Sequence, residues 1–151
     1  MKKPTFLLIL ILLSACSKES SSDYPYASGL EWFLQEEYNM NLVSLNNEEL
    51  LFVNVSCDDC MLSKLGILEK KEFTKDLKIF FLGDTTYSQI VRNYQNNNSF
   101  FDLNSSFYDY ETGISSAPLL LKIEDGIIRK HLFLSDNNQE EIITFLSKGI
   151  Q

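Results

Sequence analysis

Three short runs of apolar residues most constrain what this chain can fold into. They span residues 50–55 (LLFVNV), 77–82 (LKIFFL) and 118–123 (PLLLKI). Runs of this length, bounded by polar or turn-forming residues, predict strands that are buried on both faces of a sheet. A fourth strand is expected at 127–134, and the Glu124-Asp125-Gly126 turn before it predicts a β-hairpin.

The segments between these runs have the apolar spacing and the capping residues of helices. Asp84 and Asn104 can each cap a helix, and Asp136 with Gln139 three residues later resembles a capping box. Strands that alternate with helices and finish in a hairpin predict an α/β fold, with a central mixed sheet flanked by helices. The expected helices cover residues 30–38, 58–73, 84–95 and 104–112, with a last one after Asp136, and minor strands are expected at 42–45 and 100–103.

The chain opens with MKKPTFLLILILLSAC, which has the layout of a bacterial secretory signal peptide. Lys2 and Lys3 form its basic start, and the apolar run over residues 6–13 is too short to span a bilayer core of about 30 Å. Leu13-Ser14-Ala15-Cys16 resembles a lipobox, where cleavage leaves a lipidated cysteine at position 16. An ordinary signal peptide, with Cys16 present by chance, is the alternative.

A lipobox implies a signal peptide at 1–15, a lipidated Cys16 with a flexible tether at 16–25, and one folded domain at 26–151. The expected location is the bacterial cell envelope, with the protein anchored by lipid to a membrane and facing the periplasm or the surface. Ser17 after the lipidated cysteine, followed by Lys18 and Glu19, resembles outer-membrane sorting signals and favours that membrane.

The charge balance excludes two classes of partner. The chain has 13 basic and 21 acidic residues, and loss of Lys2 and Lys3 would leave 11 and 21, a net charge of −10 instead of −8. Such a surface repels nucleic acid and anionic lipid headgroups, so neither is an expected partner. Membrane attachment would depend on acyl chains instead.

The stretch NVSCDDC, residues 54–60, contains the most reactive residues. With Cys16 lipidated, Cys57 and Cys60 are the only thiols, in an oxidising compartment, and could form a working dithiol, a static disulfide or half of a metal site. A metal needs about four ligands, and the one histidine, His131, lies in an expected strand, so no metal or other cofactor is expected. A disulfide that closes so short a loop would stabilise the fold poorly.

A buried strand that runs into Cys-x-x-Cys at a helix start, with Ala117-Pro118 later opening a strand, hairpin and helix, resembles the thioredoxin superfamily. The nearest branch is the membrane-tethered periplasmic thiol–disulfide oxidoreductases of the cytochrome c maturation type. This resemblance covers most of the chain after the tether and implies a thioredoxin-like fold. It also implies a cis bond before Pro118, beside the dithiol, which leaves the Ala117 backbone free to pair with a substrate segment. An ordinary trans proline that opens a strand is the alternative.

Three features depart from the family pattern. Ser56 replaces the aromatic residue that usually precedes the first cysteine, and Asp58 and Asp59 replace the neutral residues common between the cysteines. Leu51 replaces the buried acid of cytoplasmic thioredoxins. Proton transfer to and from the second cysteine would then depend on Asp59, on Glu111 or on water.

The helix start assigns a role to each sulfur. Cys57 is expected to attack, because the helix dipole lowers the pKa of a thiol there, and Cys60, one turn along, is expected to resolve the mixed disulfide. Asp58 and Asp59 oppose this, since a like charge at about 6 Å in an effective dielectric of about 20 contributes roughly 2–3 kcal/mol before salt screening. A less stable thiolate disfavours the reduced form, so we expect a donor of electrons rather than a strong oxidase.

The expected partners are disulfides or thiols of exported proteins, a membrane or periplasmic electron donor, and the lipid anchor. The alternative function is a non-catalytic lipoprotein of the same fold, in which a static Cys57–Cys60 disulfide belongs to a binding or assembly module. The aromatic cluster of Phe107, Tyr108 and Tyr110 is interpreted as core and helix face rather than as a binding platform.

Overall fold

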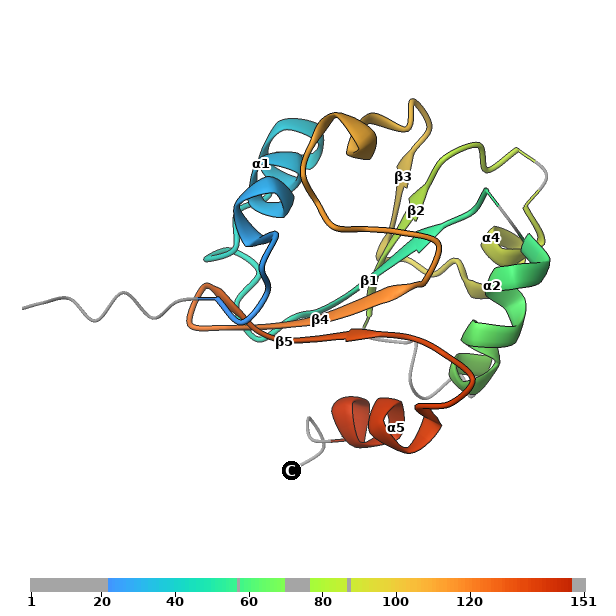
Figure 1. Cartoon of the computed structure of the whole chain (residues 1–151). Coiled ribbons are helices and arrows are strands. Elements are labelled where there is room, and N and C mark those ends of the chain that lie inside the picture. The colour runs from blue at the N-terminus through green and yellow to red at the C-terminus, as the bar shows by residue number, and fades with distance from the viewer. Residues whose placement is uncertain (1–21, 57, 70–76, 87, 148–151) are drawn as a thin grey trace, which may run out of the picture.

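The computed structural model describes residues 22–56, 58–69, 77–86 and 88–147 (Figure 1). In these ranges the helices are α1 (Ala27–Tyr38), α2 (Asp58–Leu65), α4 (Gln89–Tyr94) and α5 (Gln139–Ser147), with the short 3₁₀ helices η2 (Gly66–Glu69) and η3 (Ser106–Asp109). The strands are β1 (Glu49–Asn54), β2 (Lys78–Leu82), β3 (Ser99–Asp102), β4 (Leu119–Glu124) and β5 (Ile127–Phe133).

The strands form one five-stranded sheet in the order β3-β2-β1-β4-β5. β1 pairs in parallel with β2, and β2 with β3, whereas β4 lies antiparallel to both β1 and β5. The predicted α/β class, the mixed sheet flanked by helices, and the C-terminal hairpin followed by a helix are confirmed.

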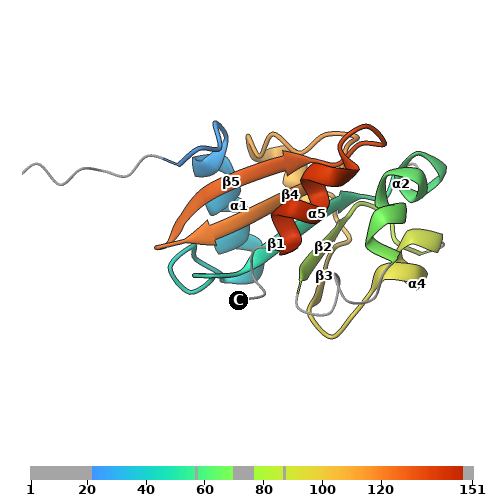
Figure 2. The same cartoon turned by 90° about the horizontal axis from the view of Figure 1, so that it is seen from below.

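β1 is the central strand and is buried on both faces, as its apolar run predicts. Leu51 and Val53 belong to a core with α2, α4 and α5, whereas Leu50 and Phe52 belong to a second core with α1. The sheet therefore separates α1 from the other three helices (Figures 1 and 2).

A row of stacked rings fills the core on the α1 side. The rings of Phe52 and Phe80 have centroids 4.7 Å apart, and those of Phe80 and Phe100 are 4.8 Å apart. These residues lie opposite one another in the register of β1, β2 and β3. Each stacked pair contributes about 0.5–1.5 kcal/mol beyond its buried area, so the row fixes the relative positions of the three strands.

Asp125 and Gly126 form the turn of the β4–β5 hairpin, with φ of 56° and 71°. Two successive residues with positive φ make a type I′ turn, whose twist matches that of the flanking strands. Glu124 pairs with Ile127 across this turn, which confirms the predicted hairpin, and the pairing shifts register between Lys122 and Ile123.

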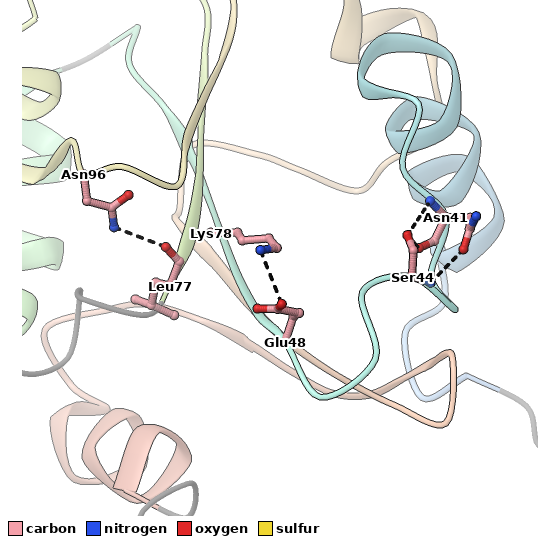
Figure 3. A network of polar contacts seen from close by, with 6 residues as sticks. All are labelled: Asn41, Ser44, Glu48, Leu77, Lys78 and Asn96. Carbon is pink, nitrogen blue, oxygen red and sulfur yellow. Dashed lines mark hydrogen bonds and ion pairs between the residues drawn. The ribbon is translucent and has the colours of Figure 1, made fainter.

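The strand expected at 42–45 is wrong. Residues 42–47 form successive turns, and Leu42 and Leu45 are buried in the core on the α1 side. The turns are held by local bonds, in which Asn41 Oδ1 accepts the Ser44 N–H at 2.7 Å (Figure 3). The apolar residues of this segment therefore indicated correctly that it is buried, but it is buried as a loop and not as a strand.

Capping was the least accurate part of the helix predictions. α4 begins at Gln89, where the Ser88 hydroxyl oxygen accepts the Val91 N–H at 3.3 Å. Asp84 instead accepts the Thr86 N–H at 2.9 Å in a turn that precedes the helix. The expected cap was wrong because an aspartate can bond a backbone N–H two residues on as readily as it can cap a helix.

The other helices differ from expectation in their ends. η3 begins at Ser106, two residues beyond Asn104, and α5 begins at Gln139, three beyond Asp136. The helix expected over 58–73 is α2 followed by η2, and residues 70–76 lie outside the described residues.

The described chain begins beside the start of β5. The Ser22 hydroxyl and the Asp23 N–H both donate to the Ile128 carbonyl at 3.1 Å, and Tyr24 is only 2% exposed. The folded unit therefore begins before the expected boundary at residue 26, because Tyr24 packs in the core on the α1 side. Ile128 lies near the amino end of β1, so the described chain begins at the end of the sheet opposite the one where β1 leads to α2.

Polar contacts join the amino end of β2 to the start of β1 on one side and to the loop before β3 on the other (Figure 3). Lys78 Nζ lies 3.3 Å from Glu48 Oε1, and Asn96 Nδ2 donates to the Leu77 carbonyl at 3.2 Å. Because the Lys78–Glu48 pair is partly exposed, it contributes at most about 1 kcal/mol. These contacts position the start of β2 between its neighbours and supply little of the stability.

Gly29 of α1 tests how closely this helix approaches the loop after η3. A Cβ at position 29 would overlap the Glu111 carbonyl oxygen, whereas a Cβ at Gly66 of η2 would meet nothing within 4 Å. We expect Gly29→Ala to lower the free energy of unfolding by about 1–3 kcal/mol, because the backbone must shift. Gly66→Ala should leave it unchanged or raise it by up to about 1 kcal/mol. Urea unfolding followed by circular dichroism measures both, and equal stabilities would contradict this packing.

Candidate functional site

The parallel strands β1, β2 and β3 end at one edge of the sheet, and the reactive stretch of the sequence begins there. β1 ends at Asn54 and α2 begins at Asp58, so NVSCDDC joins the central strand to a helix start as predicted. Open α/β sheets commonly bind ligands beyond the carboxyl ends of their strands. We call this region the carboxyl edge.

The structure describes the cysteine stretch only in part. Cys16 and Cys57 lie outside the described residues, and for Asp58 and Cys60 the backbone in the first turn of α2 is described but the side chain is not. Asp59 is exposed. Carboxylates in the first turn of a helix favour the helix dipole, so both aspartates suit this helix start.

Ala117 and Pro118 come directly before β4, which pairs with β1. Pro118 is buried, and its carbonyl accepts the Leu134 N–H at 2.8 Å. In the antiparallel register Phe52 lies opposite Leu119, so the same register continued by two residues would bring Ala117 opposite Asn54. The fold therefore brings the Ala117-Pro118 segment to the end of β1.

The peptide bond before Pro118 is trans, because no peptide bond between described residues is cis. The cis bond that the family resemblance implies is therefore not found. A trans proline suits the position, since it comes directly before a strand and the ladder needs no N–H from it.

A hydrogen bond joins α2 to the segment before Pro118. Lys64 Nζ donates to the Ser116 carbonyl at 3.2 Å. Position 60 lies one turn before Lys64, and positions four apart share one side of a helix. The side of α2 that approaches Ser116 is therefore the side that includes the backbone position of the second cysteine.

Asn54 is a buried polar residue at the very end of β1, with 6% of its surface exposed. Its Oδ1 accepts the Ser56 N–H at 3.1 Å, and its Nδ2 donates to the Tyr108 hydroxyl at 3.3 Å. The first of these bonds closes an Asx turn in the backbone that precedes position 57. The two bonds together pair both polar atoms of the buried amide, as burial requires.

Asp102 ends β3 at the same edge and is 5% exposed. Its Oδ1 accepts the Ser106 N–H and hydroxyl at 2.9 and 2.8 Å, and its Oδ2 accepts the Phe107 N–H at 2.9 Å. A buried carboxylate with three donors is well satisfied. Asp102 therefore holds η3 firmly against the carboxyl edge.

The aromatic cluster of η3 divides into a buried part and an exposed part. Phe107 is 1% exposed and packs in the core on the α1 side, whereas Tyr108 is 67% exposed. The cluster was interpreted as core and helix face: Phe107 confirms the core part, and Tyr108 lies on the exposed face of η3. Successive residues of a 3₁₀ helix point about 120° apart, so neighbours need not share an environment.

Shifts in pKa distinguish the two ends of the sheet. At the carboxyl edge, hydrogen bonds from Thr86 lower the pKa of Asp84, so this exposed acid stays ionised to a lower pH. At the other end of β1, burial raises the pKa of Glu49, and nearby Lys122 only partly offsets the effect. The negative charge of Asp84 therefore adds to that of the exposed Asp59 in this half of the molecule.

Three residues at the carboxyl edge were not predicted as site residues: Asn54, Lys64 and Tyr108. A polar side chain within the apolar run LLFVNV was the available signal for Asn54, because a buried amide requires a partner. The partners of Asn54 and Lys64 lie 54 and 52 residues along the chain, and no local pattern indicates them.

In the described part of the chain, no group of three or more His, Cys, Asp and Glu side chains is arranged to hold a metal ion. Nor is any helix in that part long and apolar enough to cross a membrane. Neither a scan against protein-family models nor a search of curated proteins gives a match, so function must be inferred from the residues themselves.

Replacement of Asn54 tests the polar contacts at the carboxyl edge. We expect Asn54→Ala to lower the free energy of unfolding by about 1–3 kcal/mol, because the partly buried bonds of the amide to the Ser56 N–H and to the Tyr108 hydroxyl are both lost. Asn137→Ala, at an exposed position, should change it by less than about 0.5 kcal/mol. Guanidinium unfolding of the two variants measures the difference, and a fully stable Asn54→Ala protein would show that water replaces the amide.

Proposed function

We propose that this protein is a membrane-anchored thiol–disulfide oxidoreductase of thioredoxin-like fold, which reduces disulfides of exported proteins through Cys57 and Cys60. The observation that most supports it is the Lys64–Ser116 hydrogen bond, which joins the helix of the Cys-x-x-Cys stretch to the segment before Pro118. With the bond before Pro118 trans, an extended client segment would still pair with the Ala117 backbone, where it would displace the bond that the Ala117 N–H donates to the Ser115 hydroxyl at 3.4 Å.

The proposed reaction needs two sulfurs and no cofactor. The Cys57 thiolate attacks one sulfur of the client disulfide, which forms a mixed disulfide and releases the other client sulfur as a thiolate. The Cys60 thiolate then attacks the Cys57 sulfur, which releases the second client thiolate and leaves a Cys57–Cys60 disulfide. The client gains two electrons, and its two thiolates take up protons from water. A dithiol of a membrane or periplasmic electron-donor protein returns the electrons by the same exchange.

The architecture is compatible with the proposed fold, and it gives the side of the domain on which the proposed anchor would lie. A mixed sheet whose central strand leads into α2, followed by a hairpin and a helix, is compatible with a thioredoxin-like domain. Ser22 and Asp23 contact Ile128 at the amino end of β1. A lipid on Cys16 would then hold the domain at the end of the sheet opposite the carboxyl edge, with that edge open to proteins of the cell envelope.

The dithiol is tested by single replacements in the mature protein. We expect the wild type to catalyse reduction of insulin disulfides by dithiothreitol, and Cys57→Ser and Cys60→Ser each to abolish turnover. Cys60→Ser should also accumulate a mixed disulfide at Cys57, because the resolving thiol is missing. Turbidity of the insulin chains measures turnover, and non-reducing gel electrophoresis measures the trapped complex.

Other outcomes have clear meanings. Trapping by Cys57→Ser instead would reverse the roles of the two sulfurs. Absence of turnover, with thiols that react with a thiol reagent only after unfolding, would contradict the proposal and support the alternative of a static disulfide in a binding or assembly module.

The two aspartates between the cysteines are expected to tune the dithiol. Replacement of both, Asp58→Asn with Asp59→Asn, should lower the pKa of the Cys57 thiol, because two nearby negative charges no longer oppose its ionisation. A more stable thiolate favours the reduced form, so the reduction potential should become less negative. Asp136→Asn, at an exposed position, is the control. Alkylation rates across pH and a glutathione redox titration measure both quantities, and an unchanged potential at low salt would refute the effect.

A further inference from the structure

Tyr108 combines two properties that rarely occur together. Its side chain is 67% exposed, yet its hydroxyl accepts a hydrogen bond from Nδ2 of the buried Asn54 at 3.3 Å. Here the polar tip is directed inward to the end of β1, and the ring remains open to solvent.

The backbone beneath this ring is well held. The Tyr108 N–H donates to the Ser105 carbonyl at 3.2 Å, and the neighbouring Phe107 is buried, with its N–H bonded to Asp102. The rings of Phe107 and Tyr108 have centroids 3.9 Å apart. Because the ring and its backbone are both fixed, binding a partner to Tyr108 would lose little conformational entropy.

The position of Tyr108 relates it to the proposed dithiol. Asn54 bonds Tyr108 with its amide nitrogen and the Ser56 N–H with its amide oxygen, so one side chain separates the ring from the turn that precedes position 57. Gly83, which follows β2, packs beside Asn54, since a Cβ there would be in van der Waals contact with the side chains of Val55 and Asn54 at 3.8 and 3.9 Å. Leu103, after β3, is 66% exposed. The carboxyl edge is thus bordered by apolar surface on the side of β3 and η3.

We infer that Tyr108 is a specificity-determining contact residue, whose ring binds an apolar side chain next to the disulfide of a client protein. The inference rests on the proposed function and extends it by naming the substrate class: disulfides in protein segments with neighbouring apolar residues, rather than small-molecule disulfides. Rigid, exposed aromatic rings near the centre of an interface commonly dominate binding. A small disulfide that reaches the sulfurs alone would not touch the ring.

The test compares two substrates on the mature protein, insulin and bis(2-hydroxyethyl) disulfide. We expect Tyr108→Ala to lower kcat/KM for insulin about tenfold, mainly through a higher KM, and to change the rate with the small disulfide less than twofold. Tyr108→Phe keeps the ring and should retain most of the activity toward insulin. Trp32→Ala is the matched control, because Trp32 of α1 is 65% exposed and should matter to neither substrate.

Each remaining outcome overturns the inference. An unchanged kcat/KM for insulin in Tyr108→Ala would show that the ring makes no contact with the client. An equal loss with both substrates would show that Tyr108 acts only through the dithiol turn, as a positioning residue. Failure of the wild type with both substrates would overturn the proposed function and this inference with it, and is distinguished from the other outcomes by the wild-type rates alone.

Discussion

The pairing of β1 with β2 on one side and with β4 on the other is the interaction on which the rest of the structure depends. β1 is buried on both faces, so its side chains contribute to both cores of the molecule. Its parallel partner brings the carboxyl ends of β1, β2 and β3 to one edge, and its antiparallel partner brings the segment before β4 to the same edge. One strand register therefore determines both what the cores contain and which loops meet at the carboxyl edge.

Buried polar groups give that edge its definite shape. Asn54 and Asp102 each end a strand, and each is almost fully buried, so desolvation would be costly if their polar atoms were unpaired. Both instead bond backbone N–H groups of the segments that follow, the turn after β1 and the helix η3. The same requirement that stabilises the fold thus orders the backbone around the cysteine stretch, and it holds Tyr108 at the position where we propose that a client binds.

The local elements of this fold were predictable where one physical signal was dominant. The three apolar runs became the strands β1, β2 and β4 because such runs are buried inside a sheet, and Asp125-Gly126 became a type I′ turn because both residues tolerate positive φ. Capping residues were less predictable. An aspartate such as Asp84 can close a turn or cap a helix, and the two arrangements differ little in free energy. Here Asp84 closes a turn and Ser88 caps the helix α4. Leu42 and Leu45 show that an apolar pair can be buried in a loop.

The sequence by itself determined the α/β class, the hairpin and its turn, and the position of the Cys-x-x-Cys stretch between a strand and a helix. These depend on interactions within a few residues or on the burial of continuous apolar runs. Only the tertiary structure decided that Ser116 meets Lys64, that the bond before Pro118 is trans, and that Asn54 is paired with Tyr108. The Lys64–Ser116 and Asn54–Tyr108 pairs are each separated by more than 50 residues along the chain. The order of strands in the sheet decides which groups meet over such a separation, and no local sequence pattern encodes that order.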